Sequence, residues 1–314
     1  MTLPHEKQLE ETLKAIRHLK KQSENTPLFT KEITRLEEKL HHLKEETYSN
    51  LTPWERVSIC RHSKRPRTSD YIKNIVTSFT ELNGDRHYGD DRAIVGGLGK
   101  IGEMKCVILG HEKGSDTESR IRHNFGMPHP EGYRKALRLM QLAEKFHLPL
   151  ISLIDTSGAF PGLEAEERGQ GLAIAENIKA MSRLKTLIIV IIIGEGASGG
   201  ALGIGVGDTI LMLEHSYYSV ITPEGCASIL WKDSSKNAQA SETLRLNAEE
   251  LMKLGVIDKI IEEPLGGAHH SPEMIYDNVK EHILEEWEAL KTIPAELLIE
   301  KRYHKFRKMG EVSQ

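Results

Sequence analysis

Cysteine is scarce in this sequence, and its spacing excludes two kinds of scaffold. The chain of 314 residues contains 3 cysteines, Cys60, Cys106 and Cys226, which lie far apart and form no CxxC pair. Such spacing argues against a zinc ribbon and against a disulfide framework, and it is typical of a protein kept in a reducing compartment.

The sequence also lacks an uninterrupted apolar run of membrane-span length and an excess of positive charge. Residues 187–206 approach the length of a span, but Glu195 and several glycines interrupt them, and a carboxylate is costly in lipid. The opening residues MTLPHEKQLEE contain no apolar stretch typical of a secretory signal, and the formal net charge is −4. We therefore expect a cytoplasmic location, with neither a membrane nor a nucleic acid as partner.

What the sequence does contain is a stretch of unusual chemistry between Leu187 and Asp208. Seven apolar residues, LIIVIII at 187–193, predict a strand buried on both faces. Glycines follow at 194, 196, 199 and 200, and the small residues 201–207 suggest a helix packed closely against other backbone. The stretch thus predicts a strand, a glycine turn and a helix N-terminus, whose unpaired N–H groups suit a phosphate or a developing oxyanion.

Four interpretations of this stretch remain open on its pattern alone. The glycines at 194, 196 and 199 match the dinucleotide-binding fingerprint. Gly196-x-Ser198-x-Gly200 matches the nucleophile elbow of a serine hydrolase. Ser198-Gly199-Gly200 could instead present two bare N–H donors as an oxyanion hole. The fourth interpretation is a packing turn without chemistry.

A second strand–turn–helix unit precedes the first. Residues 150–154 predict a buried strand, residues 157–162 form a glycine-containing turn, and a helix is expected from about Glu164 to Ile178. Thr209–Leu213 predicts a further strand. Alternating strands and helices predict an α/β fold with a parallel sheet, in which both glycine turns lie at the same edge. Two sets of backbone donors at one edge favour the oxyanion interpretation.

Four other regions carry weaker patterns. Residues 5–47 predict a helical hairpin with its turn at 25–27, because apolar residues recur at helical spacing on both sides of Asn25-Thr26-Pro27. Residues 52–70 predict an irregular basic segment, either a solvated loop or a site for a phosphate-bearing ligand or an acidic partner. Residues 111–135 predict a long polar loop rich in basic side chains, and residues 272–309 predict an exposed, helical C-terminal arm.

Several long motifs resemble one known family, the carboxyltransferase alpha subunits of bacterial-type, multi-subunit acetyl-CoA carboxylase. They are RHNFGMPHPEGYRKALRLMQLAEKF at 122–146, IDTSGAFPG at 154–162 with EERGQ at 166–170, IGEGASGGALGIGVGD at 193–208, YSVITPEGCASILWK at 218–232 and EPLGGAH at 263–269. The resemblance covers most of residues 54–270 and is far more specific than the short patterns above.

The resemblance implies a crotonase-like fold of repeated ββα units at residues 51–270. Residues 1–50 would form the helical hairpin, acting as an assembly arm, and residues 271–314 a C-terminal helical extension. It implies an assembly of two alpha and two beta chains, in which the beta subunit carries a zinc ribbon and this chain carries no metal. Carboxybiotin on a separate biotin carboxyl carrier protein, loaded by biotin carboxylase, would donate its carboxyl group to acetyl-CoA and give malonyl-CoA, the first committed step of fatty acid synthesis.

The resemblance also implies site residues. Gly199 and Gly200 would hold the biotin ureido oxygen, which leaves Ser198 as a cap or contact. The family usually has DTPGAYPG where this chain has DTSGAFPG, so Ser157 and Phe160 are departures. The expected substrate-binding residues are Gly196, Ser198, Gly158, Ala159, Phe160, Gly162, Lys113, Arg120, Arg122 and Arg134, the last four as CoA phosphate contacts. The alternatives are a non-catalytic scaffold subunit and a serine hydrolase that uses Ser198.

Overall fold

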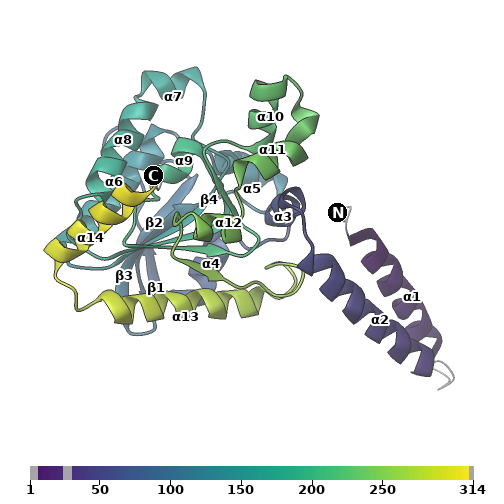
Figure 1. The fold of residues 1–314 in the computed structure, drawn as a ribbon. Coiled ribbons are helices and arrows are strands. Elements are labelled where there is room, and N and C mark those ends of the chain that lie inside the picture. Colours follow the sequence, from purple (N-terminus) through teal and green to yellow (C-terminus); the bar gives the residue numbers. More distant parts are fainter. Residues whose placement is uncertain (1–5, 24–29, 311–314) are drawn as a thin grey trace.

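An eight-stranded sheet forms the centre of the computed structural model, which describes residues 6–23 and 30–310 (Figure 1). The strand order is β1-β2-β3-β4-β5-β6-β8, and β7 pairs with the end of β5. β1 to β3 are antiparallel, whereas β3, β4, β5, β6 and β8 run parallel. The strands are β1 Thr77–Glu81, β2 Ile94–Ile101, β3 Met104–His111, β4 Leu150–Thr156, β5 Ile188–Ala197, β6 Thr209–Leu213, β7 Tyr217–Ser219 and β8 Lys259–Ile261.

Helices cover both faces of the sheet. On one face α4 (Thr68–Ile75) and α13 (Pro272–Leu290) bury apolar side chains against the strands, and on the other face α6 (Pro130–Lys145) and α12 (Ala248–Lys253) do the same. Parallel strands covered on both sides become continuous apolar runs, which is why residues 188–193 are completely buried. The predicted α/β fold is confirmed. Among the described residues, no helix has both the length and the apolar character of a membrane span.

The central strand is longer than its sequence predicts, and the helix after it is shorter. β5 continues through Gly194 and Gly196 to Ala197, because residues 195–197 pair with β7. α9 then spans Ser198–Leu202, so the helix predicted at 201–207 includes only Ala201 and Leu202, and residues 203–207 are not helical. That prediction is wrong because three glycines in seven residues make a helix unfavourable.

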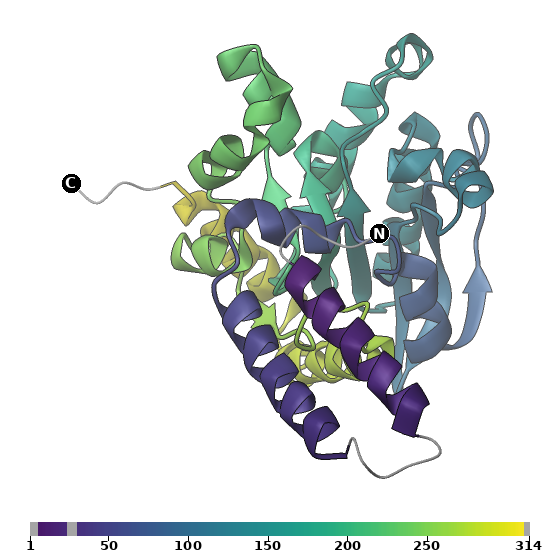
Figure 2. The same ribbon diagram turned by 90° about the vertical axis from the view of Figure 1, so that its right-hand side faces the viewer.

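The N-terminal hairpin is confirmed as two helices, α1 (Lys7–Ser23) and α2 (Thr30–Ser49), while the turn predicted at 25–27 lies outside the described residues. Figures 1 and 2 show that the pair projects from the rest of the molecule. The two helices share a small apolar cluster that reaches the main domain through Ile59.

Residues 52–70 are irregular only at 61–67, between α3 and α4. α3 (Pro53–Cys60) begins at a capping box in which Thr52 and Glu55 bond reciprocally, with proline at the first helical position. The sequence carries this start signal. Residues 111–135 are likewise more ordered than predicted, since they contain α5 (Thr117–Arg122), a 3₁₀ turn at Asn124–Gly126 and the start of α6.

The C-terminal helices are not an exposed arm. α13 buries Ile275, Val279 and Ile283 under the sheet. In α14 (Ala295–Lys308), Arg302 is 1% exposed and pairs with Asp208 while donating to three backbone carbonyls, those of Met181, Leu184 and Thr186. The expectation of an exposed arm is therefore wrong, because α14 is fastened by a buried arginine.

Candidate functional site

The two glycine turns meet at the carboxyl edge of the sheet. β4 and β5 are parallel neighbours, with Thr156 opposite Gly196. A Cβ atom built on Gly200 would lie 2.5 Å from the backbone nitrogen of Ala159 and also overlap the backbone of Gly158. A real Cβ does not fit at that distance, so only glycine permits this contact between the turns. The prediction that both turns lie together is confirmed.

Gly199 and Gly200 differ in how tightly they are enclosed. A Cβ on Gly199 would meet only Ile174, at 3.6 Å, which is ordinary van der Waals contact. Neither residue's N–H has an acceptor among the hydrogen bonds of the described residues. α9 has five residues, so its macrodipole is small, and any attraction for an anion comes mainly from these N–H groups.

Ser198 lies at the strand-to-helix junction with φ of 59°. Ser198 is exposed, and the N-cap of α9 is Ala197. Of the two roles expected for Ser198, cap or contact, the structure therefore excludes the helix cap. A left-handed serine here resembles a nucleophile elbow. However, no histidine of the described residues hydrogen-bonds to its hydroxyl; His215 lies beside Arg56, and His269 stacks on His62. Within the described residues, Ser198 therefore does not belong to a Ser–His–acid triad.

The dinucleotide fingerprint does not form a phosphate-binding turn. Gly194 and Gly196 lie inside β5 rather than in a loop. A Cβ on Gly194 would overlap the Asp155 carboxylate, and one on Gly196 would lie 2.8 Å from Tyr218. These glycines therefore allow side chains of neighbouring strands to approach, and their spacing arises from packing.

A buried ion network lies directly beneath the turns. Asp155 lies near the end of β4 and Glu195 near the end of β5; Lys113 Nζ bridges them, at 2.8 Å and 2.6 Å. Arg67 pairs with Asp155 at 2.8 Å, and Arg61 with Glu195 at 2.7 Å. The network joins both strand ends through one ammonium group, so it positions the two glycine turns relative to each other.

These groups hold their charges at neutral pH. Burial alone raises the pKa of Asp155 and of Glu195, but Lys113 and the arginines outweigh it and hold both pKa values below their ordinary range. Burial lowers the pKa of Lys113, yet the two carboxylates raise it overall. The strand ends are thus joined by fixed charges, which supports a rigid site.

The four basic residues expected to contact CoA phosphates lie in different surroundings. Lys113 is 8% exposed and belongs to the buried network. Arg134 pairs with Asp85 and Glu131. Arg120 and Arg122 lie together on α5, and Arg122 forms an exposed pair with Glu118. The structure does not bring the four into one cluster, and their contact with phosphate stays a prediction.

Three arginines of residues 52–70, Arg61, Arg65 and Arg67, pair with carboxylates in and near the network, which the sequence pattern did not reveal. Arg65 is 2% exposed and pairs in two places with Glu263, while its Nε donates to the carbonyl of Ile193 on β5. The sequence does carry a signal that buried cations are needed. Asp155 and Glu195 interrupt apolar runs, and buried carboxylates require cations as partners. The nearby basic segment supplies them.

The remaining predicted contacts lie around the first turn. Gly158 has φ of 147°, and its N–H donates to Thr156 Oγ1 at 3.1 Å. The Phe160 ring packs on His129 with centroids 4.4 Å apart, and a Cβ on Gly162 would overlap that ring. Phe160 therefore fills space beside the turn without needing the hydroxyl that the resembling family has there.

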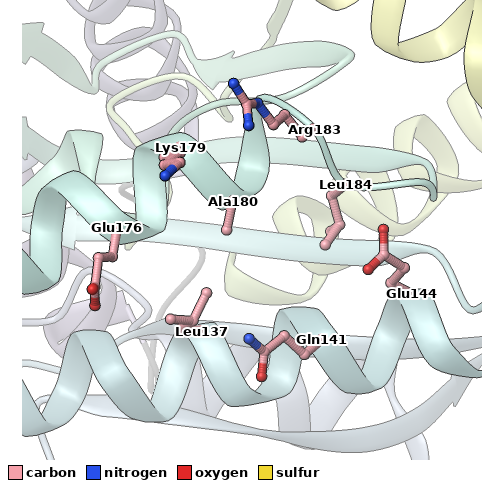
Figure 3. Close-up of a pocket in the computed structure, with 8 residues that line it drawn as sticks. All are labelled: Leu137, Gln141, Glu144, Glu176, Lys179, Ala180, Arg183 and Leu184. Carbon is pink, nitrogen blue, oxygen red and sulfur yellow. The ribbon is translucent and has the colours of Figure 1, made fainter.

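An apolar cavity of about 400 Å³ opens beside the second turn. Ser198, Gly199 and Leu202 line it on one side, and Phe306 and Met309 from the C-terminal end line it on another. A second cavity of about 370 Å³ lies between α6 and α8 (Gln170–Met181), as Figure 3 shows. Its rim carries Glu144, Glu176, Lys179 and Arg183, and none of the predicted site residues lines it.

Comparison with known proteins gives consistent results. The model of the family described as "Acetyl co-enzyme A carboxylase carboxyltransferase-like" matches residues 2–310. The acetyl-coenzyme A carboxylase carboxyl transferase subunit alpha of Protochlamydia amoebophila (strain UWE25) is 63% identical, over 98% of both chains. The subunit of the same description from Chlamydia pneumoniae is 58% identical, over 98% of this chain and 95% of that one.

Solved structures share the fold at low identity. A chain of transcarboxylase 12S with methylmalonyl-coenzyme A bound matches with a TM-score of 0.60 and 16% identity, over 75% of this chain and 44% of that one. A Pseudomonas malonate decarboxylase hetero-tetramer in complex with coenzyme A matches with a TM-score of 0.56 and 13% identity, over 69% of this chain and 86% of that one. These neighbours confirm the expected crotonase-like fold.

Proposed function

The chain belongs to the acetyl-CoA carboxylase carboxyltransferase family, and from this premise we propose that it is an alpha subunit whose complex transfers a carboxyl group from carboxybiotin to acetyl-CoA, giving malonyl-CoA. The observation that carries the proposal is the contact of Gly200 with the turn at Gly158 and Ala159. It holds backbone donors at one place on the sheet edge, as a site that stabilises a developing oxyanion requires.

The residues present fit a biotin ring. The cavity beside Gly199 is apolar on most sides, and the N–H groups of Gly199 and Gly200 have no acceptor among the described residues. Carboxybiotin, when bound, would supply the carboxyl group, and its ureido oxygen would carry the negative charge that the site stabilises. In this proposal the two N–H groups stabilise that oxygen, and the network of Lys113 with Asp155 and Glu195 holds the donors in place.

The further partners belong to the same proposal. A beta subunit with a zinc ribbon would hold acetyl-CoA in an assembly of two alpha and two beta chains, and a biotin carboxyl carrier protein loaded by biotin carboxylase would deliver the substrate. Residues 51–270 would be the catalytic domain and 271–314 its extension. Residues 1–50 would be an assembly arm, which agrees with the projecting hairpin in Figures 1 and 2.

Reconstitution tests the proposal. The purified chain, the beta chain and their mixture are assayed for decarboxylation of malonyl-CoA with biocytin as acceptor. We expect activity from the mixture alone, because each chain holds half of the site. Turnover by this chain alone at the rate of the complex would contradict the shared site. A scaffold subunit instead predicts that a Gly200 variant leaves the activity of the mixture unchanged.

A further inference from the structure

Three imidazole rings and a carboxylate gather where the N-terminal hairpin meets the main domain. His269 and His270 follow the paired glycines after β8, and their ring centroids lie 4.3 Å apart. His62, just after α3, stacks on His269 with centroids 3.7 Å apart. Glu6, at the start of α1, faces His270 with 4.0 Å between Oε1 and Nε2. Three segments distant in the sequence thus meet at one point.

The side chains of Glu6, His269 and His270 are arranged like metal ligands. One ligand atom from each lies within 4.8 Å of the others. Tetrahedral ligands about 2.1 Å from zinc lie about 3.4 Å apart, so movements of roughly an ångström would bring the three onto one ion. Two imidazoles and one carboxylate form a donor set that zinc uses, with water as the fourth ligand.

The surroundings orient these groups. The Tyr48 hydroxyl donates to Glu6 Oε1 at 2.8 Å, as outer partners of metal-bound carboxylates commonly do. His269 Nδ1 is buried and has no hydrogen-bond partner among the described residues. Without a metal this buried nitrogen has no partner among the described residues, whereas a zinc ion would give the His269 ring a ligand bond.

We propose that Glu6, His269 and His270 form a zinc site that fastens α1 to the loop after β8. This proposal differs from the expectation that the chain carries no metal. The sequence alone does not show that the hairpin brings Glu6 close to the two histidines. The site would join the projecting hairpin to the main domain, because Glu6 lies beside α1 and the two histidines follow β8.

Zinc binding to the full chain, alone and in complex with the beta subunit, tests the site. The chain is stripped with EDTA, titrated with ZnCl₂ by calorimetry and assayed for bound zinc after dialysis. Variants His270→Ala and Glu6→Gln each remove one ligand, and both positions lie near the surface, so folding is checked by circular dichroism. The matched control is His42→Ala, because His41, His42 and Glu45 form an exposed imidazole–carboxylate group on α2.

We expect one zinc ion per parent chain and a higher melting temperature with zinc than with EDTA. Both ligand variants should lose at least about tenfold in affinity, together with the thermal shift, as removal of metal-supporting groups commonly does. His42→Ala should match the parent. No zinc binding by the parent chain, or binding that both ligand variants retain at parental affinity, would overturn the proposal.

Discussion

A Cβ atom on Gly200 would lie 2.5 Å from the backbone nitrogen of Ala159, so the start of α9 rests directly on the turn that follows β4. The neighbouring Gly199 has room for a methyl group. This asymmetry separates two roles that the sequence cannot distinguish: close contact between the turns depends on Gly200, whereas Gly199 could carry a small side chain and keep its N–H.

Lys113 is expected to act by holding the strand ends together. Lys113→Met leaves two buried carboxylates without their shared cation, which should lower the free energy of unfolding by about 3 kcal/mol and lower kcat. Lys100→Met is the matched control, since Lys100 pairs with the exposed Glu103 and such pairs contribute about 0–1 kcal/mol. Urea unfolding and steady-state kinetics measure both. A raised KM for acetyl-CoA with unchanged stability would instead identify Lys113 as a phosphate contact.

Arg120, on α5, is a candidate for contact with CoA phosphates. Arg120→Ala should raise KM for acetyl-CoA about twofold to fivefold, matching roughly 0.5–1 kcal/mol for an exposed ion pair, and the effect should shrink at high salt. Arg134→Ala should chiefly destabilise the fold, because it breaks the ion pair with the buried Asp85. KM for acetyl-CoA, measured for both variants at low and high salt, shows which of the two arginines contacts the CoA phosphates. Unchanged KM in Arg120→Ala would show that α5 is a solvated surface.

Ser198 is expected to be dispensable as a nucleophile. Ser198→Ala should keep activity within about fivefold of the parent, since a hydrogen bond from an exposed hydroxyl contributes about 1 kcal/mol. The serine hydrolase alternative predicts near-total loss and covalent labelling by acylating reagents. Mass spectrometry of the parent after such treatment provides the check, and a labelled Ser198 peptide would refute the carboxyltransferase assignment of this turn.

The Arg65–Glu263 pair predicts stability that falls in acid. Burial raises the pKa of Glu263, but Arg65 outweighs it and lowers the pKa to about 2. Because the unfolded value is about 4.3, the stabilisation is complete at neutral pH, declines below about pH 4.3 and is lost as pH falls through about 2.

Glu263→Gln isolates this contribution from that of the other carboxylates. At neutral pH the variant should be about 3–5 kcal/mol less stable, because Arg65 remains buried without its partner. In urea unfolding from about pH 7 to about pH 3, its stability should fall less steeply than that of the parent. Equal slopes for the two proteins would show that Glu263 titrates normally in the folded chain.

Much of the fold follows from apolar periodicity. The runs at 150–154 and 188–193 predict buried parallel strands, and the strands place both glycine turns at one edge. The end of β5 escaped prediction because residues 195–197 are extended by pairing with β7, a long-range contact with no local signal. Glycine alone could not show where the strand stops.

The candidate site was predictable in its backbone and not in its charges. The glycines of both turns carry a local pattern, but the cations beneath them come from residues 61–67 and 113, far from Asp155 and Glu195 in sequence. In the sequence alone, a basic segment is typical of a solvated loop. Only the fold shows that buried carboxylates lie beside it. The burial of Arg302 was not predicted for the same reason, because its partner Asp208 is distant from it in the sequence.

The kcat of two alanine variants, Gly200→Ala and Gly199→Ala, tests the central claim most directly when both are assembled with the beta chain. Gly200→Ala should push the two turns apart and lower kcat by about 10²-fold or more, the loss seen when one oxyanion donor is removed, with a smaller change in KM. Gly199→Ala should stay within about tenfold of the parent, because its methyl group has room. Melting temperatures and assembly of both variants are measured alongside. An assembled, folded Gly200→Ala complex with parental kcat would contradict the account.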